Sequence, residues 1–334
     1  MGMREPAFWW QPGGGRLLAP LGILYGAVAS ARMAAPGASA GIPVICLGNF
    51  TVGGAGKTPA ALTVAHLLLA EHARPFFLSR GYGGQFAGPV HVDLSFHHAA
   101  DVGDEPLLLA GLAPTIVARD RVAGARTARI GGAGVIVMDD GFQNPSLKKD
   151  LAIVLVDGTR SVGNGRVIPA GPLRAPLQAQ LARAHAIIVV GPADNAASIM
   201  DAAGRRGIAI FHARLEPDHG SVAALGGRKV LAFAGIGNPD KFFATLAGAG
   251  VAVAERMSFP DHHRYTANEA SELLARASAA GLVLMTTEKD HVRLGGNPVL
   301  VTLAARAIAL PVRLVVEEQD HFRQIVLDAM KRRS

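Results

Sequence analysis

The sequence predicts an α/β protein with a mostly parallel sheet, a second, smaller α/β domain and an apolar helix at the N-terminus. Three observations support this fold class. Short apolar runs recur between helical or glycine-rich stretches, which is typical of parallel strands covered on both faces. A second series of such runs begins after residue 227. With 334 residues, 50% apolar and 18% charged, the chain is long enough for two cores of ordinary domain size.

The apolar runs give the expected elements in order. In the large domain, we expect strands at residues 44–47, 76–78, 115–117, 135–138, 153–156 and 187–190, and a helix from 57 to about 73. In the smaller domain, we expect strands at 229–234, 251–254 and 283–286, with helices from about 239 and 267. The predicted division is an N-terminal apolar segment at 1–35, a large domain at 36–213, a linker at 214–220 and a smaller domain at 221–334. The last helical pattern, 322–330, can pack on either domain.

The N-terminal segment favours association with a membrane surface. Trp9 and Trp10 precede an uncharged stretch at residues 17–31, which is flanked by Arg16 and Arg32. This stretch is shorter than the roughly 20 residues that span a bilayer. Paired tryptophans beside arginine suit the headgroup boundary, where leucine and isoleucine side chains enter the acyl region. Two alternatives remain at this point, a helix docked on the protein core and a cleaved signal peptide.

Composition also limits the classes of function. The single cysteine, Cys46, excludes a disulfide framework, and its place in an apolar run predicts a buried strand residue. Thirty-three Lys and Arg against 26 Asp and Glu give a net charge of +7, which favours an anionic partner. Only 5% of residues are aromatic, and basic and aromatic residues do not alternate in any run. We therefore expect no nucleic-acid partner.

A glycine-rich segment predicts a phosphate-binding loop. Its residues are Thr51, Val52, Gly53, Gly54, Ala55, Gly56, Lys57 and Thr58. It follows an expected strand and opens an expected helix, which is the context of a Walker A loop and so of a P-loop NTPase-type domain. Backbone amides would meet the phosphates, Lys57 would reach the β- and γ-oxygens, and the Thr58 hydroxyl can ligate Mg²⁺. Thr51 replaces the usual first glycine, so the loop is a variant.

Two carboxylates follow the expected strand at 135–138. Asp139 and Asp140 would lie at the carboxyl edge of the sheet, beside the phosphate loop. A carboxylate there can hold Mg²⁺ directly or through water. Adjacent side chains point in different directions, so we expect only one of the two to contact the metal. A solvated turn before Gly141 is the alternative.

A nucleotide site leaves open what receives the phosphate. A kinase, a GTPase and a membrane-recruited switch ATPase all remain. GTPases usually read guanine with Asn-Lys-x-Asp, and the nearest string here, residues 287–290, has its lysine displaced by one place. Switch ATPases of the partitioning type carry an extra lysine where this chain has Val52. Both alternatives are therefore less favoured than a kinase.

A kinase needs a base near the acceptor hydroxyl. Asp104 lies between two expected strands and ahead of an apolar helix, so it can serve as a helix N-cap, as the base, or as both. His262 lies in a polar loop of the smaller domain, in the string Asp261-His262-His263. An isolated histidine is as often structural as functional. The residues alone leave both roles open.

At this point the chain resembles the tetraacyldisaccharide 4'-kinases, the lipid A 4'-kinases of Gram-negative bacteria. The resemblance covers nearly the whole chain. Its motifs lie, in order, at residues 48–59, 79–84, 103–106, 139–143, 163–165, 169–174, 234–239, 259–262 and 287–290. The Thr51 variant of Walker A is a feature of this family. One departure is Ala175, where the family often has an acid, which puts any acidic contact there in doubt.

The resemblance implies transfer of the ATP γ-phosphate to the 4'-hydroxyl of a tetraacylated glucosamine disaccharide 1-phosphate, giving lipid IVA. The reaction would take place on the cytoplasmic face of the inner membrane. It also implies Asp104 as the catalytic carboxylate and His262 as a partner that raises its basicity or orients it. Lys57 and Thr58 would serve ATP and Mg²⁺, with Asp139, Asp140 and Glu105 as further metal ligands or network acids. The implied substrate-binding residues are Arg80, Tyr82, Arg121, Gln143 and Arg174. A membrane-attached nucleotide switch is the alternative function.

Overall fold

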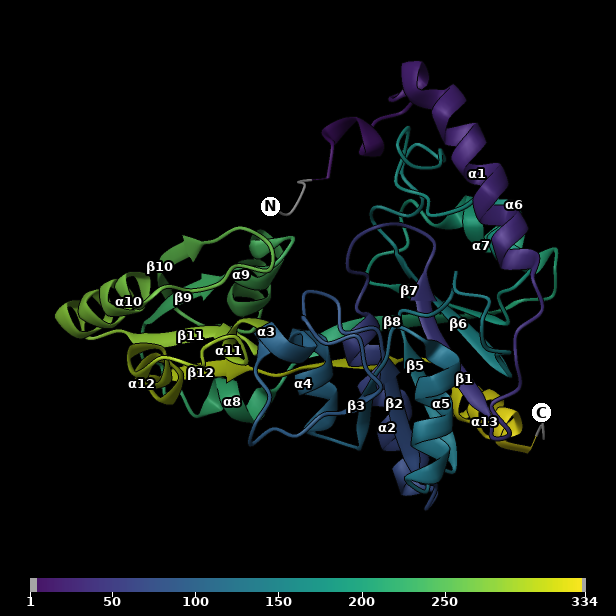
Figure 1. The fold of residues 1–334 in the computed structure, drawn as a ribbon. Helices are drawn as coiled ribbons and strands as arrows, with labels where there is room; N and C mark the ends of the chain where they lie inside the picture. The colour runs from purple at the N-terminus through teal and green to yellow at the C-terminus, as the bar shows by residue number, and fades with distance from the viewer. Residues whose placement is uncertain (1–4, 332–334) are drawn as a thin grey trace.

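The computed structural model describes residues 5–331 and arranges them around two sheets (Figure 1). The larger sheet has nine strands in the order β13-β8-β7-β6-β1-β5-β2-β4-β3, and the smaller has four in the order β10-β9-β11-β12. The large sheet contains β1 (Val44–Asn49), β2 (Pro75–Ser79), β3 (Val90–His91), β4 (Thr115–Val117), β5 (Val135–Asp139), β6 (Leu151–Asp157), β7 (Ala186–Val190), β8 (Ala209–Pro217) and β13 (Val312–Val316). The small sheet contains β9 (Val230–Ala234), β10 (Val253–Ser258), β11 (Val283–Thr287) and β12 (Ala307–Leu310).

Helices cover both faces of each sheet. Short 3₁₀ segments at Ala7–Trp10 and Arg16–Leu18 precede α1 (Ala19–Ala34). The large domain continues with α2 (Lys57–Ala70), α3 (Ala99–Val102), α4 (Asp104–Ala110), α5 (Arg121–Ile130), α6 (Leu177–Leu181), α7 (Ala197–Gly204) and, at the end of the chain, α13 (Gln319–Lys331). The smaller domain, on the left of Figure 1, has α8 (His219–Ala223), α9 (Pro239–Gly248), α10 (Ala267–Ala280), α11 (Glu288–His291) and α12 (Pro298–Arg306).

The central strands are parallel and buried, as the apolar runs predict. β1 lies between β5 and β6 and pairs with both in parallel, and all six of its residues are buried. One core layer joins β1 to α2 and α13, through residues such as Leu47, Leu68 and Val326. The opposite layer joins β1 to α5 and α7, through residues such as Cys46, Ala125 and Ile199. Cys46 is fully buried, as expected of a strand residue.

The chain enters the small sheet from the large one and then returns. β8 extends the large sheet to Pro217, into the segment expected to link the domains. β13 pairs antiparallel with β8, with Leu314 opposite Leu215. The following helix, α13, buries Phe322 and Val326 against the same core as α2. The division into domains remains a proposal, and the sheet assignments would place 209–217 and 312–331 with the large domain.

Helix α1 projects beside the loop at 167–176 and leaves most of its surface exposed (Figure 1). Only Gly22, Gly26 and Met33 are buried. A Cβ added at Gly22 would lie 2.7 Å from the Val167 carbonyl oxygen, so the glycine allows close approach to the loop. Within the described residues, Arg16–Ala34 is the one helical segment whose length and composition would allow it to cross a membrane, with a mean hydropathy of 1.4. The exposure of α1 argues against a core helix.

Candidate active site

The phosphate loop lies where β1 ends and α2 begins. Gly53 and Gly56 have φ of 103° and 85°, in the left-handed region that favours glycine. Thr51 forms a bridge to Leu173, and the Val52 amide donates to the Pro172 carbonyl at 2.9 Å. The start of the loop is thus attached to the neighbouring 167–174 segment, while Gly54 is exposed and Ala55 is buried.

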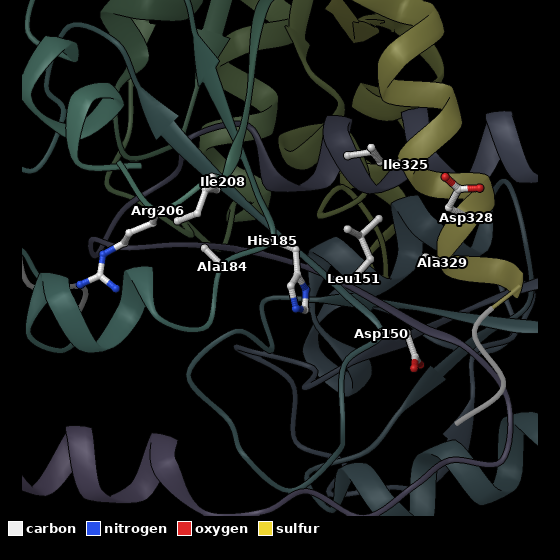
Figure 2. Close-up of a pocket in the computed structure, with 10 residues that line it drawn as sticks. Asp150, Leu151, Ala184, His185, Arg206, Ile208, Ile325, Asp328 and Ala329 are labelled. Carbon is white, nitrogen blue, oxygen red and sulfur yellow. The ribbon is translucent and has the colours of Figure 1, made fainter. Parts of the chain in front are cut away.

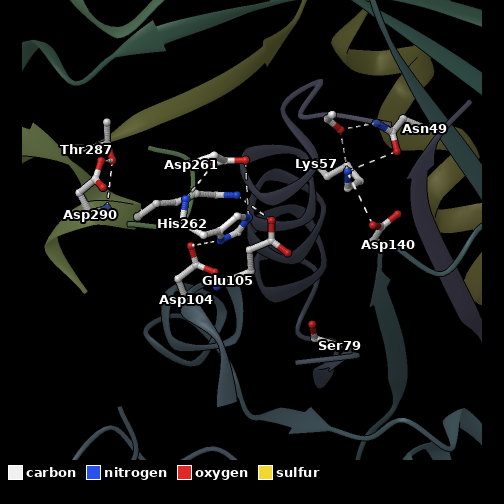
Figure 3. A network of polar contacts seen from close by, with 12 residues as sticks. Asn49, Lys57, Ser79, Asp104, Glu105, Asp140, Asp261, His262, Thr287 and Asp290 are labelled. Carbon is white, nitrogen blue, oxygen red and sulfur yellow. Dashed lines mark hydrogen bonds and ion pairs between the residues drawn. The ribbon is translucent and has the colours of Figure 1, made fainter. Parts of the chain in front are cut away.

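Lys57 is pre-positioned by polar contacts at this junction (Figure 3). Its Nζ donates to Asn49 Oδ1 and to the Gly53 carbonyl, each at 3.3 Å, and lies 3.9 Å from Asp140 Oδ2. Asn49 in turn donates to the Gly53 carbonyl at 2.7 Å. A buried ammonium held by weak, long contacts is free to exchange them for phosphate oxygens. Asn49 therefore orients the lysine, a role that the sequence analysis did not assign.

The buried polar atoms beside Lys57 fit a magnesium ion. Thr58 Oγ1 and both carboxylate oxygens of Asp139 are buried and have no hydrogen-bond partner among residues 5–331. Burial, together with the charge of Glu105, raises the pKa of Asp139 to about 7. Unpartnered buried oxygens are costly unless a ligand satisfies them. Mg²⁺ in nucleotide sites is usually held by one or two protein oxygens, with substrate phosphates and waters completing its shell.

Asp140 has a different environment from its neighbour. Its carboxylate accepts two hydrogen bonds from Arg174, at 2.8 and 3.2 Å. Burial opposes ionisation of Asp140, but Lys57 and Arg174 outweigh it and lower the pKa. Arg174 Nε also donates to the Thr51 carbonyl at 3.1 Å, and Gln143 donates to the Asn49 carbonyl at 2.7 Å. In this structure Arg174 and Gln143 therefore hold the backbone at the start of the phosphate loop through hydrogen bonds.

Asp104 and His262 meet between the two domains. Asp104 starts α4 in the large domain, and its Oδ2 lies 3.4 Å from His262 Nδ1. Arg293, which follows α11, donates through Nε to the same oxygen at 3.1 Å and also contacts it through Nη2. The Asp104 carboxylate also accepts from the Glu105 amide at 3.1 Å, and it caps no other amide of α4. Three polar groups thus converge on a carboxylate that is only 4% exposed.

The electrostatics of this pair favour one of the two expected roles of His262. Burial opposes ionisation of Asp104, but the hydrogen bond from His262 and the charges of Arg293 and Lys289 lower its pKa below the usual range. The hydrogen bond to Asp104 raises the pKa of His262 above 6.5, against burial. His262 therefore does not raise the basicity of Asp104 in this arrangement. It fits the orienting role.

Glu105 bridges the domains beside this pair. Its carboxylate accepts from Lys289 Nζ at 2.6 Å, and Lys289 belongs to α11 of the smaller domain. Burial opposes the charge on Lys289, yet Glu105 and Asp104 raise its pKa. Glu105 is near enough to Asp139 to raise that pKa as well. Glu105, an expected metal ligand, is therefore paired with Lys289 in this structure. It is also close enough to Asp139 to influence its charge.

The three remaining expected substrate residues lie in two settings. Tyr82 is 67% exposed and its ring centroid lies 5.4 Å from that of His262, while Arg80 is exposed on the same segment. Arg121 is only 2% exposed, donates to the Ala118 carbonyl at 2.6 Å and leaves its Nε without a partner. Tyr82 is thus brought to the Asp104–His262 pair, whereas Arg121 is a buried cation with spare donor capacity.

Besides Asn49, two residues of this site had no role in the sequence analysis. Lys289 belongs to the motif at residues 287–290, so its position was visible although its partner was not. Arg293 is buried, and its Nη1 donates to Asp290 Oδ1 at 2.9 Å and to the Gly235 carbonyl at 2.7 Å. The spacing of three residues between Asp290 and Arg293 is a local pattern from which their ion pair could have been predicted. Its pairing with Asp104, 189 residues earlier, has no local signal at all.

A separate cleft of about 330 Å³ lies at the opposite end of the large sheet (Figure 2). It is lined by the residues just before β6, β7 and β8, such as Asp150, His185 and Ile208, and by Asp328 of α13. The phosphate loop follows the carboxyl end of β1, and ligands of open α/β sheets bind at that edge. The cleft in Figure 2 therefore lies away from the nucleotide site.

Comparison with known proteins identifies the family of this chain. A model of the family described as tetraacyldisaccharide-1-P 4'-kinase matches residues 15–331. The tetraacyldisaccharide 4'-kinase of Rhodopseudomonas palustris strain BisB5 is 52% identical over 330 residues, covering 98% of this chain and 96% of that protein. The corresponding protein of Methylobacterium sp. strain 4-46 is 54% identical over 322 residues, covering 95% of each.

A solved structure is similar over the whole fold. It is described as the "apo" form of LpxK from Aquifex aeolicus in complex with ATP, and it superimposes with a TM-score of 0.73 at 27% identity. The match covers 95% of this chain and 99% of the other. The likeness in fold, together with relatives that are about half identical along their full length, decides the family. This chain belongs to the tetraacyldisaccharide-1-P 4'-kinase family.

Proposed function

We propose that this chain transfers the γ-phosphate of ATP to the 4'-hydroxyl of a tetraacyldisaccharide 1-phosphate, giving lipid IVA. The observation that carries the proposal is the pairing of a Walker A loop with a buried carboxylate, Asp104, held by residues of the second domain. A nucleotide switch would need only the loop. A kinase also needs a group that accepts the proton of the attacking hydroxyl, and Asp104 supplies one.

The phosphate loop accounts for the nucleotide side of the reaction. Residues 51–58 would cradle the phosphates with their amides, and Lys57 would contact the β- and γ-oxygens. Thr58 and Asp139 are the protein groups that would hold Mg²⁺, since their buried oxygens lack partners. When bound, Mg²⁺ neutralises the charge that develops on the phosphates. Asp140 is paired with Arg174, so Asp139 is the stronger candidate for direct contact with the metal.

Asp104 and His262 account for the acceptor side. An Asp104 with a lowered pKa is ionised at neutral pH, so it can accept a hydrogen bond from the 4'-hydroxyl and take its proton as the phosphoryl group arrives. His262 fixes the orientation of the carboxylate through its contact with Oδ2. Tyr82, exposed beside His262, and Arg80 are placed to contact the sugar or its phosphate. Arg121 can stabilise charge through its unpartnered Nε.

The two-domain arrangement fits a reaction that excludes water. Asp104 and Glu105 belong to the large domain, and their ionic partners Arg293, Lys289 and His262 belong to the smaller one. Movement of one domain changes the surroundings of Asp104 directly. Closure around ATP and acceptor would expel water that could otherwise hydrolyse ATP.

The exposed face of α1 fits attachment to the membrane that holds the lipid acceptor. Leu21, Ile23 and Leu24 are 56%, 74% and 66% exposed, which is costly in water and favourable in the acyl region. We propose that α1 lies on the cytoplasmic face of the inner membrane, where ATP is present. The helix would bring the loop at 167–174, and with it the phosphate loop, close to the lipid surface.

Product analysis tests this function. Purified protein is incubated with γ-labelled ATP, Mg²⁺ and the tetraacyldisaccharide 1-phosphate, and lipids are separated by thin-layer chromatography. We expect a labelled lipid product that is absent with Lys57→Ala and reduced about 10²- to 10⁴-fold with Asp104→Asn, the usual contribution of a general base. ATP hydrolysis without any labelled lipid would contradict the kinase and favour the switch.

A further inference from the structure

The N-terminal segment places a carboxylate against the phosphate loop. A side chain added at Gly53 would overlap with Glu5 Oε1. Gly53 belongs to the phosphate loop, and its carbonyl accepts from Lys57 Nζ at 3.3 Å, so Glu5 contacts the loop at the residue that also contacts the lysine. This contact is not used by the reaction described above. A carboxylate at an anion-binding loop occupies space that a ligand phosphate would otherwise use.

The other oxygen of the same carboxylate is held by an arginine. Arg160 Nη1 donates to Glu5 Oε2 at 3.0 Å, and the Arg160 guanidinium lies 5.0 Å from the centroid of the Trp10 ring. Arg160 follows β6, the strand next to β1, and its amide donates to Asp157 Oδ1 at 3.0 Å. The turn after β6 and the ring of Trp10 therefore hold the Arg160 guanidinium next to Glu5, at the phosphate loop.

The two ends of this arrangement are anchored separately. The Asn164 amide donates to the Trp9 carbonyl at 2.8 Å, and Trp9 Nε1 donates to the Pro169 carbonyl at 3.0 Å. The side chains of Glu5 and Arg160 are nevertheless 28% and 42% exposed, so solvent and ligands reach them. Burial, partly offset by Arg160, raises the pKa of Glu5. Because both side chains of this ion pair are partly exposed, an incoming phosphate can compete with Glu5 for Arg160.

We propose that Arg160 binds a phosphate group of a ligand at the phosphate loop, and that Glu5 holds this position in the ligand-free chain. A phosphate arriving over Gly53 brings negative charge next to Glu5, which repels the carboxylate and frees the guanidinium. Arginine then takes the phosphate through charge-assisted hydrogen bonds. Because Gly53 contacts Lys57, the β- or γ-phosphate of ATP is the nearer source. The 1-phosphate of the acceptor has the same chemistry. The inference rests on the proposed function, because it assumes that ATP binds at this loop.

Direct binding measurements on the full chain test the proposal. Titration calorimetry with Mg²⁺ and a non-hydrolysable ATP analogue gives a dissociation constant without turnover. Replacing Arg160 with Ala should weaken binding about tenfold, the effect of losing one charge-assisted hydrogen bond. AMP, which lacks the β- and γ-phosphates, should bind both proteins equally. Arg160→Lys keeps the charge and should recover part of the loss.

The companion variant reports on Glu5. Glu5→Gln removes the competing charge and should tighten binding of the ATP analogue. If Glu5 acts through Arg160, most of that gain in affinity disappears when Glu5→Gln is combined with Arg160→Ala. Arg323→Ala is the matched control, since Arg323 forms a comparably exposed ion pair with Glu71 at the far end of α2. It should leave the dissociation constant unchanged. Melting temperatures of all variants show whether each is folded.

The outcomes separate the possible sources of the phosphate. If Arg160→Ala weakens binding of the ATP analogue, the phosphate that Arg160 binds belongs to the nucleotide. An unchanged nucleotide affinity with a raised KM for the acceptor assigns the phosphate of the lipid. If folded Arg160→Ala changes neither, the Glu5–Arg160 pair only anchors the N-terminal segment and the proposal is overturned. If the wild-type chain binds no ATP analogue, or Lys57→Ala does not weaken binding, the proposed function itself fails instead.

Discussion

At the scale of single residues, the site is organised by which polar atoms have partners. Asp140 is satisfied by Arg174, whereas both oxygens of Asp139 and the hydroxyl of Thr58 are buried without partners. In the same way, Asp104 is surrounded by donors that keep it ionised. Adjacent or similar residue types therefore have different chemistry because their neighbours differ. Two predictions follow from these surroundings.

The pKa of His262 should depend on Asp104. The hydrogen bond to Asp104 raises it above 6.5, so Asp104→Asn should shift the His262 titration to lower pH. The raised pKa of His262 also determines how this contact changes the stability of the fold with pH. The contribution of this contact to folding is complete below pH 6.5 and is lost as the pH rises through the folded-state pKa. Ring-proton NMR spectra across pH measure the midpoint. An unshifted midpoint in Asp104→Asn would exclude this coupling.

Asp139→Asn should weaken the response of the chain to magnesium. Removing the unpartnered carboxylate removes the charge that attracts the cation, whereas the amide keeps the size of the side chain. We expect Mg²⁺ to strengthen binding of an ATP analogue markedly in the wild type and much less in this variant. Calorimetric titrations with and without Mg²⁺ provide the comparison. Equal enhancement in both proteins would show that Asp139 is not a ligand.

At the scale of elements, α1 contacts the rest of the protein mainly through two glycines, whereas most of its large apolar side chains are exposed. Gly22 and Gly26 face the loop at 167–176, and the added Cβ positions there lie 2.7 and 3.1 Å from Val167 and Pro176. Leu21 and Leu24, in contrast, are 56% and 66% exposed. The helix therefore contacts the protein along a narrow face that contains the two glycines, while its large apolar side chains near the N-terminal end stay exposed.

Charge on the free face of α1 should impair membrane binding. Leu21→Glu with Leu24→Glu places two carboxylates in the acyl region and should reduce co-sedimentation with vesicles of mixed neutral and anionic lipids. Ile130→Glu is the control, because Ile130 is 79% exposed on α5 of the large domain. It should sediment with vesicles as the wild type does. Equal losses in both variants would show that α1 has no special role.

At the scale of the whole molecule, the two domains are joined by strands and by buried charge. The chain passes from β8 to the smaller sheet and returns through β13, and ion pairs from α4 to α11 and Arg293 close the gap between them. Such ionic contacts are directional and can be exchanged, unlike a large apolar interface. They fit the domain closure proposed above.

Breaking one ionic contact should loosen this arrangement. Lys289→Ala leaves Glu105 without its partner and should increase the mean separation of the domains in the ligand-free chain. Fluorescent probes placed on α5 and α10 would report a longer mean distance by energy transfer. Lys331→Ala, which removes an ion pair within α13, is the matched control and should leave the distance unchanged. An unchanged distance in Lys289→Ala would mean that the remaining contacts hold the domains.

The local sequence determined the phosphate loop, the buried parallel strands and the exposed apolar helix. Each depends on neighbouring residues: glycine spacing at 53–56, apolar runs such as 135–138, and the uncharged stretch at 17–31. The pairing of Asp104 with His262, proposed above as catalytic, was implied by the family resemblance rather than by spacing. The structure brings those two residues to 3.4 Å across the domains.

Only the tertiary structure decided which distant residues meet. Arg293 reaches Asp104, Glu5 reaches Gly53, and β13 rejoins the large sheet beside β8. None of these contacts has a local pattern, because they depend on how whole elements pack and on which buried charges find partners. The direction of the pKa shift at Asp104 follows from the same packing. Local sequence therefore determined the elements and the nucleotide loop, whereas long-range packing decided how the acceptor side is held.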